Sequence, residues 1–393
     1  MRHATFRLSS SPRMPKIAVN TRLLKSGRLE GIGWFTWQSL RRVVEAHPEV
    51  EFHFIFDAKP ARQFIDFPNV VAHVVLPPAR RIVLYKLWFD YLIPAKLRAI
   101  EADLFVSPDG FASLRTTVPQ LLVMHDLNFE HYPELLPRQV AKFYRERFPR
   151  FAALAVRIAT VSRYSARDIN RTYGVSLNQI DVVYNGVNPE FKPLGTAEIV
   201  RTREELTGGL PYFIYVGSLH PRKNIQRLLA AYDLFRAQHD QAFRLVLAGA
   251  RMWKDPLLDQ AFKAMQYKDE VVFTGRALPE QLARYVGAAE AMTFVPLFEG
   301  FGIPALEAFA AGVPLLASNT TALPEVCGAA ALLVDPLDEE AIAAGMLRLS
   351  ADAAYRQDAV ARGFTQLQQF SWDRTAALLW ESIEKTLADR DAR

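Results

Sequence analysis

Two successive series of short apolar runs, alternating with helix-like segments, constrain the fold of this chain more than any other feature. The runs of the first series are 16–20, 51–57, 104–107, 121–125 and 158–162, with helical periodicity at 34–46, 82–100 and 138–154. The second series has runs at 212–217, 243–248, 271–274, 291–295 and 314–317, and its first helix is predicted at 224–238. This alternation predicts parallel sheets with helices on both faces. We therefore expect an α/β chain of two facing, doubly wound, Rossmann-like domains.

The segment from Tyr184 to Pro211 interrupts both series and is rich in turn residues, which predicts an interdomain linker. It divides the chain into a domain at 16–190, a domain at 191–370, and a closing helix with a polar tail at 371–393. Residues 1–15 carry arginines and serines but no acidic residue and no apolar core, so we expect a disordered leader rather than a secretory signal. A length of 393 residues is compatible with two domains.

Cysteine and charge content exclude several classes of protein. The single cysteine, Cys327, rules out a disulfide framework and a multi-cysteine zinc site, and a reduced, cytoplasmic compartment follows. Residues 1–195 hold 27 Lys and Arg against 17 Asp and Glu, whereas residues 196–393 hold 20 against 25. A basic half can attract a membrane surface, an anionic substrate or nucleic acid, or simply be a solvated surface. The chain shows no aromatic RNA-binding signature and no zinc-finger spacing, so nucleic acid is not an expected partner.

The sharpest motif is Glu299-Gly-Phe-Gly-Ile-Pro-Ala-Leu-Glu307, which follows a predicted strand. Pro304 suits the first turn of a helix, and the glycines before it let backbone approach a ligand closely. Free amides at a helix N-terminus bind phosphate, and the two carboxylates would then contact hydroxyl groups on either side of it. The alternative is an acidic first turn that complements the helix dipole.

Two cations follow another predicted strand, in Gly217-Ser-Leu-His-Pro-Arg-Lys-Asn224. Arg222 and Lys223 stand near a helix N-terminus, where positive charge is unfavourable for the dipole. They are better explained as partners of a diphosphate, although solvated surface charges remain an alternative.

Two weaker features lie in the first half. Gly31 and Gly33 follow the first predicted strand but lack the full G-x-G-x-x-G spacing, so a plain strand-to-helix turn is as good an interpretation as a ligand-facing loop. His125 ends another strand and is expected to point into the interdomain crevice, unless its role is structural.

Taken together, these residues resemble the family 4, group 1 type glycosyltransferases of the GT-B fold, over nearly the whole chain after Lys16. The resemblance rests on Glu299 and Glu307, on the segment from Gly217 to Asn224, and on Val271-Val-Phe-Thr-Gly-Arg276. It extends to Ala322-Leu-Pro-Glu-Val326 and to the helix that begins near Phe370-Ser-Trp372. The resemblance implies that the C-terminal helix returns to the first domain.

The resemblance also implies an enzyme that moves a hexose of mannose or glucose type from a nucleoside-diphosphate sugar to a glycan or lipid-linked acceptor, with retention, in surface polysaccharide biosynthesis. The first domain would bind the acceptor and the second the donor. The implied catalytic residues are Glu299, His125, Lys223 and Arg222, and the implied donor-binding residues are Gly31, Gly33, Gly217, Arg222, Lys223, Arg276, Glu299, Gly300, Phe301, Gly302, Ile303 and Glu307.

In this family Glu299 would contact the donor sugar, Glu307 the ribose, and the cations the diphosphate. We expect no cofactor and no metal, because the one D-x-D sequence, at Asp389 and Asp391, lies in the polar tail. Rival hypotheses are an epimerase or phosphorylase on the same architecture and a binding module without activity.

The stretch from Arg80 to Arg98 combines cations and aromatic residues, with apolar residues at 84, 87, 88, 91 and 92. Their spacing predicts a helical stripe that packs on the first sheet. The alternative is that this helix, or a neighbouring basic surface, contacts an anionic membrane, which would place the protein at the inner face of the membrane.

Overall fold

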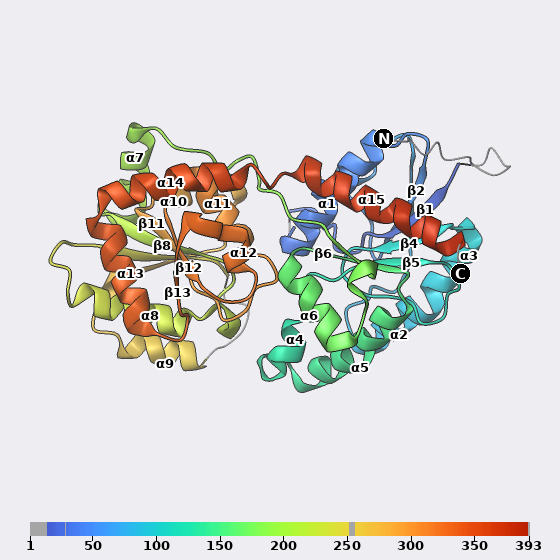
Figure 1. Ribbon diagram of the computed structural model, residues 1–393, viewed down its shortest axis with the longest axis horizontal. Helices are drawn as coiled ribbons and strands as arrows, with labels where there is room; N and C mark the ends of the chain where they lie inside the picture. Colours follow the sequence, from blue (N-terminus) through green and yellow to red (C-terminus); the bar gives the residue numbers. More distant parts are fainter. Residues whose placement is uncertain (1–13, 28, 251–255, 392–393) are drawn as a thin grey trace. The chain divides into compact units, whose positions relative to one another are not determined.

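The computed structural model describes residues 14–27, 29–250 and 256–391 (Figure 1). The proposed leader therefore lies outside the described residues up to position 13. The chain forms two compact units. The first comprises the chain up to Val123, residues 150–158 and the segment from Leu379 onward, and the second comprises residues 124–149 and 159–378.

The first sheet has seven strands in the order β3-β2-β1-β4-β5-β6-β7, and β1 pairs in parallel with both β2 and β4. Its strands are β1 (Lys16–Asn20), β2 (Glu51–Phe56), β3 (Val70–Val74), β4 (Leu104–Ser107), β5 (Gln120–Val123), β6 (Arg157–Thr160) and β7 (Ile180–Val182). The connecting helices are α1 (Gly31–Ala46), η1 (Arg62–Phe64), α2 (Ile82–Leu87), the π-helical turn η2 (Trp88–Leu92), α3 (Ile93–Ile100), α4 (Asn128–His131), η3 (Pro133–Leu135), α5 (Arg138–Leu154), α6 (Arg163–Tyr173) and η4 (Leu177–Gln179).

The second sheet has six strands in the order β10-β9-β8-β11-β12-β13. Its strands are β8 (Tyr212–Val216), β9 (Arg244–Ala248), β10 (Val271–Gly275), β11 (Ala291–Phe294), β12 (Leu315–Ser318) and β13 (Ala331–Val334). The helices around it are α7 (Thr196–Thr207), η5 (Pro221–Lys223), α8 (Ile225–Arg236), α9 (Pro256–Ala264), η6 (Lys268–Glu270), α10 (Pro279–Gly287), α11 (Ile303–Ala311), α12 (Leu323–Cys327), η7 (Gly328–Ala330), α13 (Glu339–Ala351) and α14 (Ala353–Leu367). Helices α8, α9 and α13 lie on one face of this sheet and α10, α11 and α14 on the other (Figure 1).

The chain reverses the order of strands once in each sheet. In the first sheet the reversal lies between β1 and β4, and in the second between β8 and β11. Strand β8 pairs with β11 through Phe213 with Ala291 and Ile214 with Met292, so the two strands end at the same level. Ligands of doubly wound sheets bind beyond the carboxyl ends of strands at such a switch point.

The last helix, α15 (Trp372–Asp391), begins in the second unit and ends in the first. In the first unit Trp380 stacks on His47 at 3.5 Å between ring centroids. Asp389 accepts a hydrogen bond of 2.8 Å from Arg157. The expected return of the C-terminal helix is confirmed, and this ion pair gives Asp389 of the tail D-x-D sequence a structural role. No helix in the described residues is both long and apolar enough to cross a membrane.

Most predicted elements are present, but three strands were missed. These are β3, β7 and β13, and each lies at the edge of its sheet. Strands β3 (VVAHV) and β13 (ALLV) are nevertheless apolar, and β7 (IDV) has only three residues; periodicity cannot distinguish apolar runs this short from a buried helical segment. Helix α1 also begins at Gly31 rather than at Trp34. The charged part of the proposed linker forms α7, which ends at Gly208 in the left-handed conformation (φ 67°).

Candidate active site

The loop after β8 holds two cations in a fixed position beside β11. Gly217 has φ 142°, and a Cβ atom there would lie 2.7 Å from the Tyr215 hydroxyl oxygen, so the turn requires glycine. After the short turn η5, Asn224 adopts a left-handed conformation (φ 63°) and donates hydrogen bonds to the carbonyl oxygens of Val295, at 3.0 Å, and Pro336, at 2.6 Å. Buried Asn224 thus ties the segment that carries Arg222 and Lys223 to the end of β11.

Arg222, Lys223 and Glu299 form one charged cluster at this switch point. Lys223 Nζ contacts Glu299 Oε1, and Arg222 Nη1 lies 3.3 Å from the same oxygen. Arg222 also donates a hydrogen bond of 2.6 Å to the carbonyl oxygen of Phe298. The Lys223 ammonium lies 5.3 Å from the ring centroid of Phe294, within the range of a cation–π interaction. The structure therefore brings together three residues that the sequence predicted in separate loops.

The electrostatics of the cluster reflect burial and mutual pairing. Burial lowers the pKa of Lys223, and the attraction of Glu299 does not fully restore it. Burial also acts to lower the pKa of Arg222, but Glu299 and, more weakly, Asp126 outweigh it and leave that pKa raised. Two cations thus share one directly contacting carboxylate, so a further anion can be accommodated here.

The loop from Glu299 to Ile303 is held from several sides. The buried ring of Phe301 packs against Tyr184 and Phe370, with centroids 6.3 Å and 5.7 Å away, so this residue can offer only its backbone to a ligand. Gly300 is closely packed, since a Cβ atom would lie 2.3 Å from the His125 carbonyl oxygen. Gly302 has φ 101° and supplies no side-chain oxygen to cap α11. The helix N-terminus beside the cluster is therefore suited to bind an anion with its amides.

Two hydroxyl groups that we did not predict fix the same loop. Ser162 Oγ donates a hydrogen bond of 2.7 Å to the Gly300 carbonyl oxygen, and Ser165 Oγ lies 3.1 Å from it. Ser162 is also the N-cap of α6, where it accepts from the Ser165 amide. An N-cap serine has an ordinary structural explanation, so the sequence carried no signal for this second role.

Glu307 differs from Glu299 because it has no charged partner. It lies in α11, about one turn after the helix begins, and within the described residues its carboxylate forms no hydrogen bond or ion pair. Burial raises the pKa of Glu307 to about 7. A partly buried carboxylate without a partner is costly, and hydroxyl groups of a ligand would satisfy it.

The remaining predicted residues are placed as follows. Gly31 is the first residue of α1 and has open space where a side chain would stand, whereas a Cβ atom on Gly33 would lie 3.2 Å from the Leu23 carbonyl oxygen. Both belong to the first unit. Arg276 lies exposed directly after β10. His125 belongs to the second unit, and its carbonyl oxygen accepts a hydrogen bond of 3.3 Å from Ser165 Oγ.

The switch point of the first sheet holds an ion pair that the sequence analysis missed. Arg22 Nη2 lies 2.6 Å from Asp109 Oδ2, and both side chains are less than a tenth exposed. Arg22 also donates to the Tyr85 hydroxyl at 2.8 Å, and Asn20 donates to Asp109 at 2.9 Å. Single charged residues after strands are common, and nothing in their spacing distinguished this pair.

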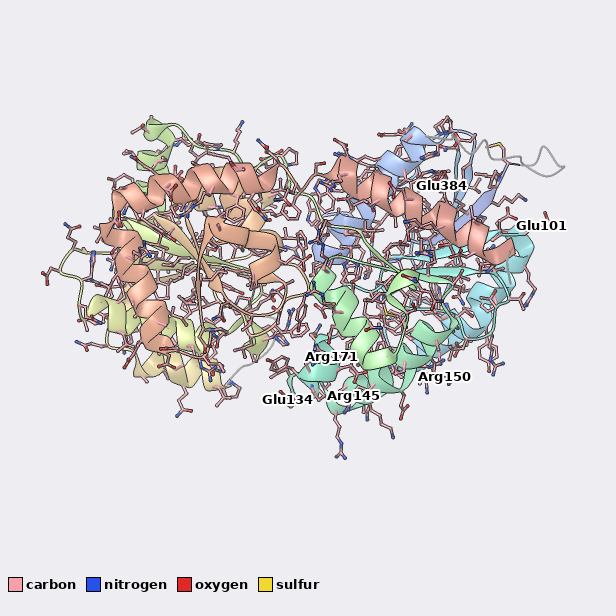
Figure 2. All side chains as sticks on the ribbon, viewed as in Figure 1. Glu101, Glu134, Arg145, Arg150, Arg171 and Glu384 are labelled. Carbon is pink, nitrogen blue, oxygen red and sulfur yellow. The ribbon has the colours of Figure 1, made fainter. Side chains whose placement is uncertain are left out.

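A large cavity lies elsewhere in the second unit. It has a volume of about 820 Å³, and its lining includes Glu134 and Arg145, which are labelled in Figure 2, together with Glu130 and Tyr173. None of the candidate donor-binding residues lines it. Glu130 is already bound by Arg145 at 3.0 Å and by the Tyr173 hydroxyl at 2.9 Å. The described residues also contain no group of three or more His, Cys, Asp or Glu side chains that could hold a metal ion.

Two family models together cover most of the chain. Residues 30–191 match the model "Glycosyltransferase Family 4", and residues 197–366 match "Glycosyl transferases group 1". With two doubly wound sheets and a charged cluster at the switch point of the second, the chain has the architecture of the GT-B class. It belongs to the family 4, group 1 glycosyltransferases, as the motifs predicted.

Relatives agree with this assignment, and a solved structure shares the fold. O-antigen chain mannosyltransferase B of Escherichia coli is 33% identical over 250 residues, which are 63% of this chain and 66% of that protein. The serotype-specific mannosyltransferase WbdA of Escherichia coli is 29% identical over 275 residues, 67% of this chain and 33% of that protein. The matches thus span about two thirds of the first relative and one third of the second. The structure of HepE from Anabaena in complex with UDP and glucose has a TM-score of 0.73 at 17% identity, covering 94% of this chain and 100% of that one.

Proposed function

We propose that this chain transfers a mannosyl group from a nucleoside-diphosphate sugar to a glycan or lipid-linked glycan acceptor in surface polysaccharide biosynthesis. The single observation that carries the proposal is the cluster of Arg222, Lys223 and Glu299 beside the N-terminus of α11, with the unpaired Glu307 one turn further on. This arrangement matches a ligand with a central diphosphate and hydroxyl groups on both sides of it.

The diphosphate of the donor would take the place beside the two cations. Arg222 and Lys223 now share Glu299, and a doubly charged diphosphate attracts both cations more strongly than a single carboxylate does. The backbone amides of Gly302 and Ile303 would bind phosphate oxygens at the helix N-terminus. Glu299 would then turn its free oxygen to hydroxyl groups of the sugar.

The nucleoside would lie on the other side of the diphosphate. Glu307 would accept hydrogen bonds from the ribose diol, which gives its buried carboxylate the partner that it lacks. Arg276 is proposed to border the base, and the tight turn at Gly217 lets the chain pass close to the ligand. Gly31 and Gly33 are proposed to approach the phosphate and the sugar, and His125 to lie beside the sugar.

The chemical step would proceed with retention of the anomeric configuration. The bond between sugar C1 and the β-phosphate oxygen breaks, and the acceptor oxygen forms a bond to C1 on the same face. The acceptor proton passes to the leaving phosphate oxygen, whose new negative charge is stabilised by Lys223, Arg222 and the helix amides. Fixed cations at this position can take the role that a metal ion has in other transferases, so we propose that the reaction is metal-independent.

The choice of mannose rests on the relatives. O-antigen chain mannosyltransferase B and WbdA of Escherichia coli are named as mannosyltransferases, and O-antigen chain mannosyltransferase RfbU of Salmonella typhimurium is 24% identical over 332 residues. An acceptor on a growing surface polysaccharide follows from the same names. GDP-mannose is therefore the first donor to test, and UDP-glucose the second.

The test is a panel of sugar nucleotides screened by thermal shift and by hydrolysis, followed by product analysis with an oligosaccharide acceptor. We expect GDP-mannose to raise the melting temperature most and to yield an α-linked mannoside. An isomerised donor or a sugar phosphate as the product would identify an epimerase or a phosphorylase instead. Tight donor binding without any turnover, over a range of acceptors, would identify a binding module.

A further inference from the structure

An exposed apolar surface lies at the edge of the first sheet, remote in sequence from the donor residues. Of the fifteen exposed large apolar side chains in the described residues, six lie between positions 71 and 91. They are Val71, Val74, Leu76, Val83, Leu87 and Tyr91. Val71 and Val74 face opposite sides of the sheet, because side chains alternate along a strand, so we give the name β3–α2 surface to the other four. Exposed apolar groups gathered in one region indicate an interaction site rather than the scattered surface residues of any protein.

The apolar stripe predicted between Arg80 and Arg98 is only partly buried in the structure. Trp88 is buried, and its Nε1 donates a hydrogen bond of 3.0 Å to the Val75 carbonyl oxygen. By contrast, Leu87 and Tyr91 are 39% and 51% exposed, and Val83 is 75% exposed. Positions 83, 87 and 91 recur every four residues, so the three share one face of the continuous helix α2–η2. The same bond brings Val75, and therefore the adjoining Leu76, next to this helix. Only part of the predicted stripe packs on the sheet.

The charge around this surface is almost entirely positive. Residues 70–100 contain the cations Arg80, Arg81, Lys86, Lys96 and Arg98 and a single acidic residue, Asp90. Asp90 is buried and accepts a hydrogen bond from the Leu114 amide. No described residue forms an ion pair with Arg80, Arg81 or Arg98. Arg115 adds a further cation over the ring of Tyr91, 4.3 Å from its centroid.

We infer that the β3–α2 surface binds an anionic lipid bilayer and holds the protein on its surface. An interfacial helix buries an apolar face at the boundary of headgroups and acyl chains while cations beside it attract anionic lipid. Val83, Leu87 and Tyr91 supply such a face, and Arg80, Arg81 and Lys86 flank it in sequence. A protein partner or a second copy of this chain would have to bring acidic groups to these cations, whereas an anionic bilayer supplies negative charge over its whole surface. The inference does not depend on the identity of the sugar donor.

The first test asks whether the apolar face enters the bilayer. Cys327 is buried, so a cysteine introduced by Val83→Cys can be labelled selectively with an environment-sensitive dye. The matched control is Val200→Cys on α7. Val200 is 56% exposed and far in sequence from the cations between Arg80 and Arg98. We expect vesicles of phosphatidylglycerol and phosphatidylcholine to shift the emission of the Val83→Cys label to the blue and to leave the control unchanged. An unchanged emission at both positions would overturn the inference.

The second test asks whether charge drives the binding. In vesicle sedimentation at low salt, Arg80→Glu with Arg81→Glu should reduce the bound fraction at least tenfold, since each basic residue near an anionic surface contributes to the attraction. The matched control, Lys263→Glu with Lys268→Glu, makes the same change of charge on exposed lysines of the second unit and should retain binding. Equal loss in both pairs, or equal binding to vesicles of pure phosphatidylcholine, would contradict the proposal.

Two further measurements distinguish membrane binding from dimerisation of this chain and from the proposed donor reaction. Val83→Ser with Leu87→Ser should release the protein from vesicles while donor hydrolysis in solution stays at the wild-type rate, because neither residue belongs to the donor site. If sedimentation equilibrium instead shows a dimer that this variant dissociates, the surface is an interface between two copies and the inference is wrong. Failure of the proposed donor reaction would appear as lost hydrolysis in the wild-type protein and would leave the vesicle results intact.

Discussion

The two sheets place a charged cluster at the same topological position, but the balance of charge differs between the two clusters. Between β1 and β4, Arg22 is paired with Asp109 at 2.6 Å, and Asp57 adds a second carboxylate to its surroundings. Between β8 and β11, two cations contact one carboxylate, Glu299. By direct contacts the first cluster has one cation and one carboxylate, whereas the second has two cations and one carboxylate.

The two clusters also differ in their exposure to solvent. Arg22 lies against the rings of Tyr85 and Phe111, at 4.8 Å and 5.3 Å from their centroids, and these rings shield the pair from solvent. Arg222 retains 18% of its side-chain exposure, and the N-terminus of α11 lies beyond the Glu299 loop. The second switch point therefore combines an excess of cations with exposure to solvent, and the first has neither.

The largest expected effect follows from breaking the first cluster. Arg22→Ala leaves Asp109 buried without its partner and should lower the free energy of unfolding by about 3–5 kcal/mol. Urea denaturation measures it. Arg62→Ala, which removes an exposed pair with Asp66 at 3.7 Å, should cost less than about 1 kcal/mol. If Arg22→Ala were as mild as this control, the first cluster would not be structural.

Lys223→Ala tests the second cluster and should mainly lower kcat. Negative charge on the diphosphate grows as the glycosidic bond breaks, so loss of the ammonium should cost about 10²-fold or more in kcat and less in donor affinity. Steady-state kinetics with the best donor of the panel measures both. Lys263→Ala, an exposed lysine on α9, serves as the control. A Lys223→Ala variant within about threefold of wild type would remove this lysine from the reaction.

Glu307→Ala should raise the donor KM with little change in kcat. A ribose contact exists in the ground state and the transition state alike, so its loss weakens both equally, by roughly 1–3 kcal/mol. Glu325→Ala offers a comparison on α12, since Glu325 already accepts hydrogen bonds from the amides of Arg163 and Tyr164. That variant should affect stability more than KM. A folded Glu307→Ala protein with unchanged donor KM would contradict the assigned role.

The unpaired state of Glu307 also predicts a pH effect on the ligand-free protein. Its pKa is raised by burial to about 7, above the ordinary value, so the folded state binds its proton more tightly than the unfolded state does. This contribution to stability is present below about pH 4.5 and is lost as the pH rises through 7. Glu307→Gln should therefore be more stable than wild type at pH 8, on the order of 2 kcal/mol, and equal to it at pH 4. If Glu307→Gln and the wild type had equal free energies of unfolding at both pH 4 and pH 8, the carboxylate would have a partner in solution.

The smallest expected effect is that of chelation. If Arg222 and Lys223 stabilise the leaving diphosphate, EDTA should leave turnover within about twofold. Loss of activity that Mg²⁺ or Mn²⁺ restores would show that a metal shares this role. The two cations of the second cluster would then not be sufficient to stabilise the leaving diphosphate. Measuring the activity of Lys223→Ala with and without Mg²⁺ would show whether the metal replaces the lysine or acts together with it.

Much of the fold followed from sequence because central strands are buried on both faces. Such strands must be continuous apolar runs, and β1 and β4 have the predicted bounds. The edge strands β3, β7 and β13 were missed although β3 and β13 are apolar, because runs of three to five residues do not distinguish a strand from a buried helical segment. The family motif likewise led to the prediction of Glu299 and Glu307, because their spacing on either side of a helix start can be read directly from the sequence.

Only the tertiary structure decided how those charges are paired. Glu299 and Lys223 are 76 residues apart, and their contact depends on β8 and β11 being neighbours that end at the same level. The pairing of Arg22 with Asp109 depends in the same way on β1 and β4. Sequence determined which charged groups stand after which strands, because that is a local property. Strand order and burial decided which carboxylate is satisfied and which is left for a ligand, because a charge acquires its partner only when distant segments are brought together.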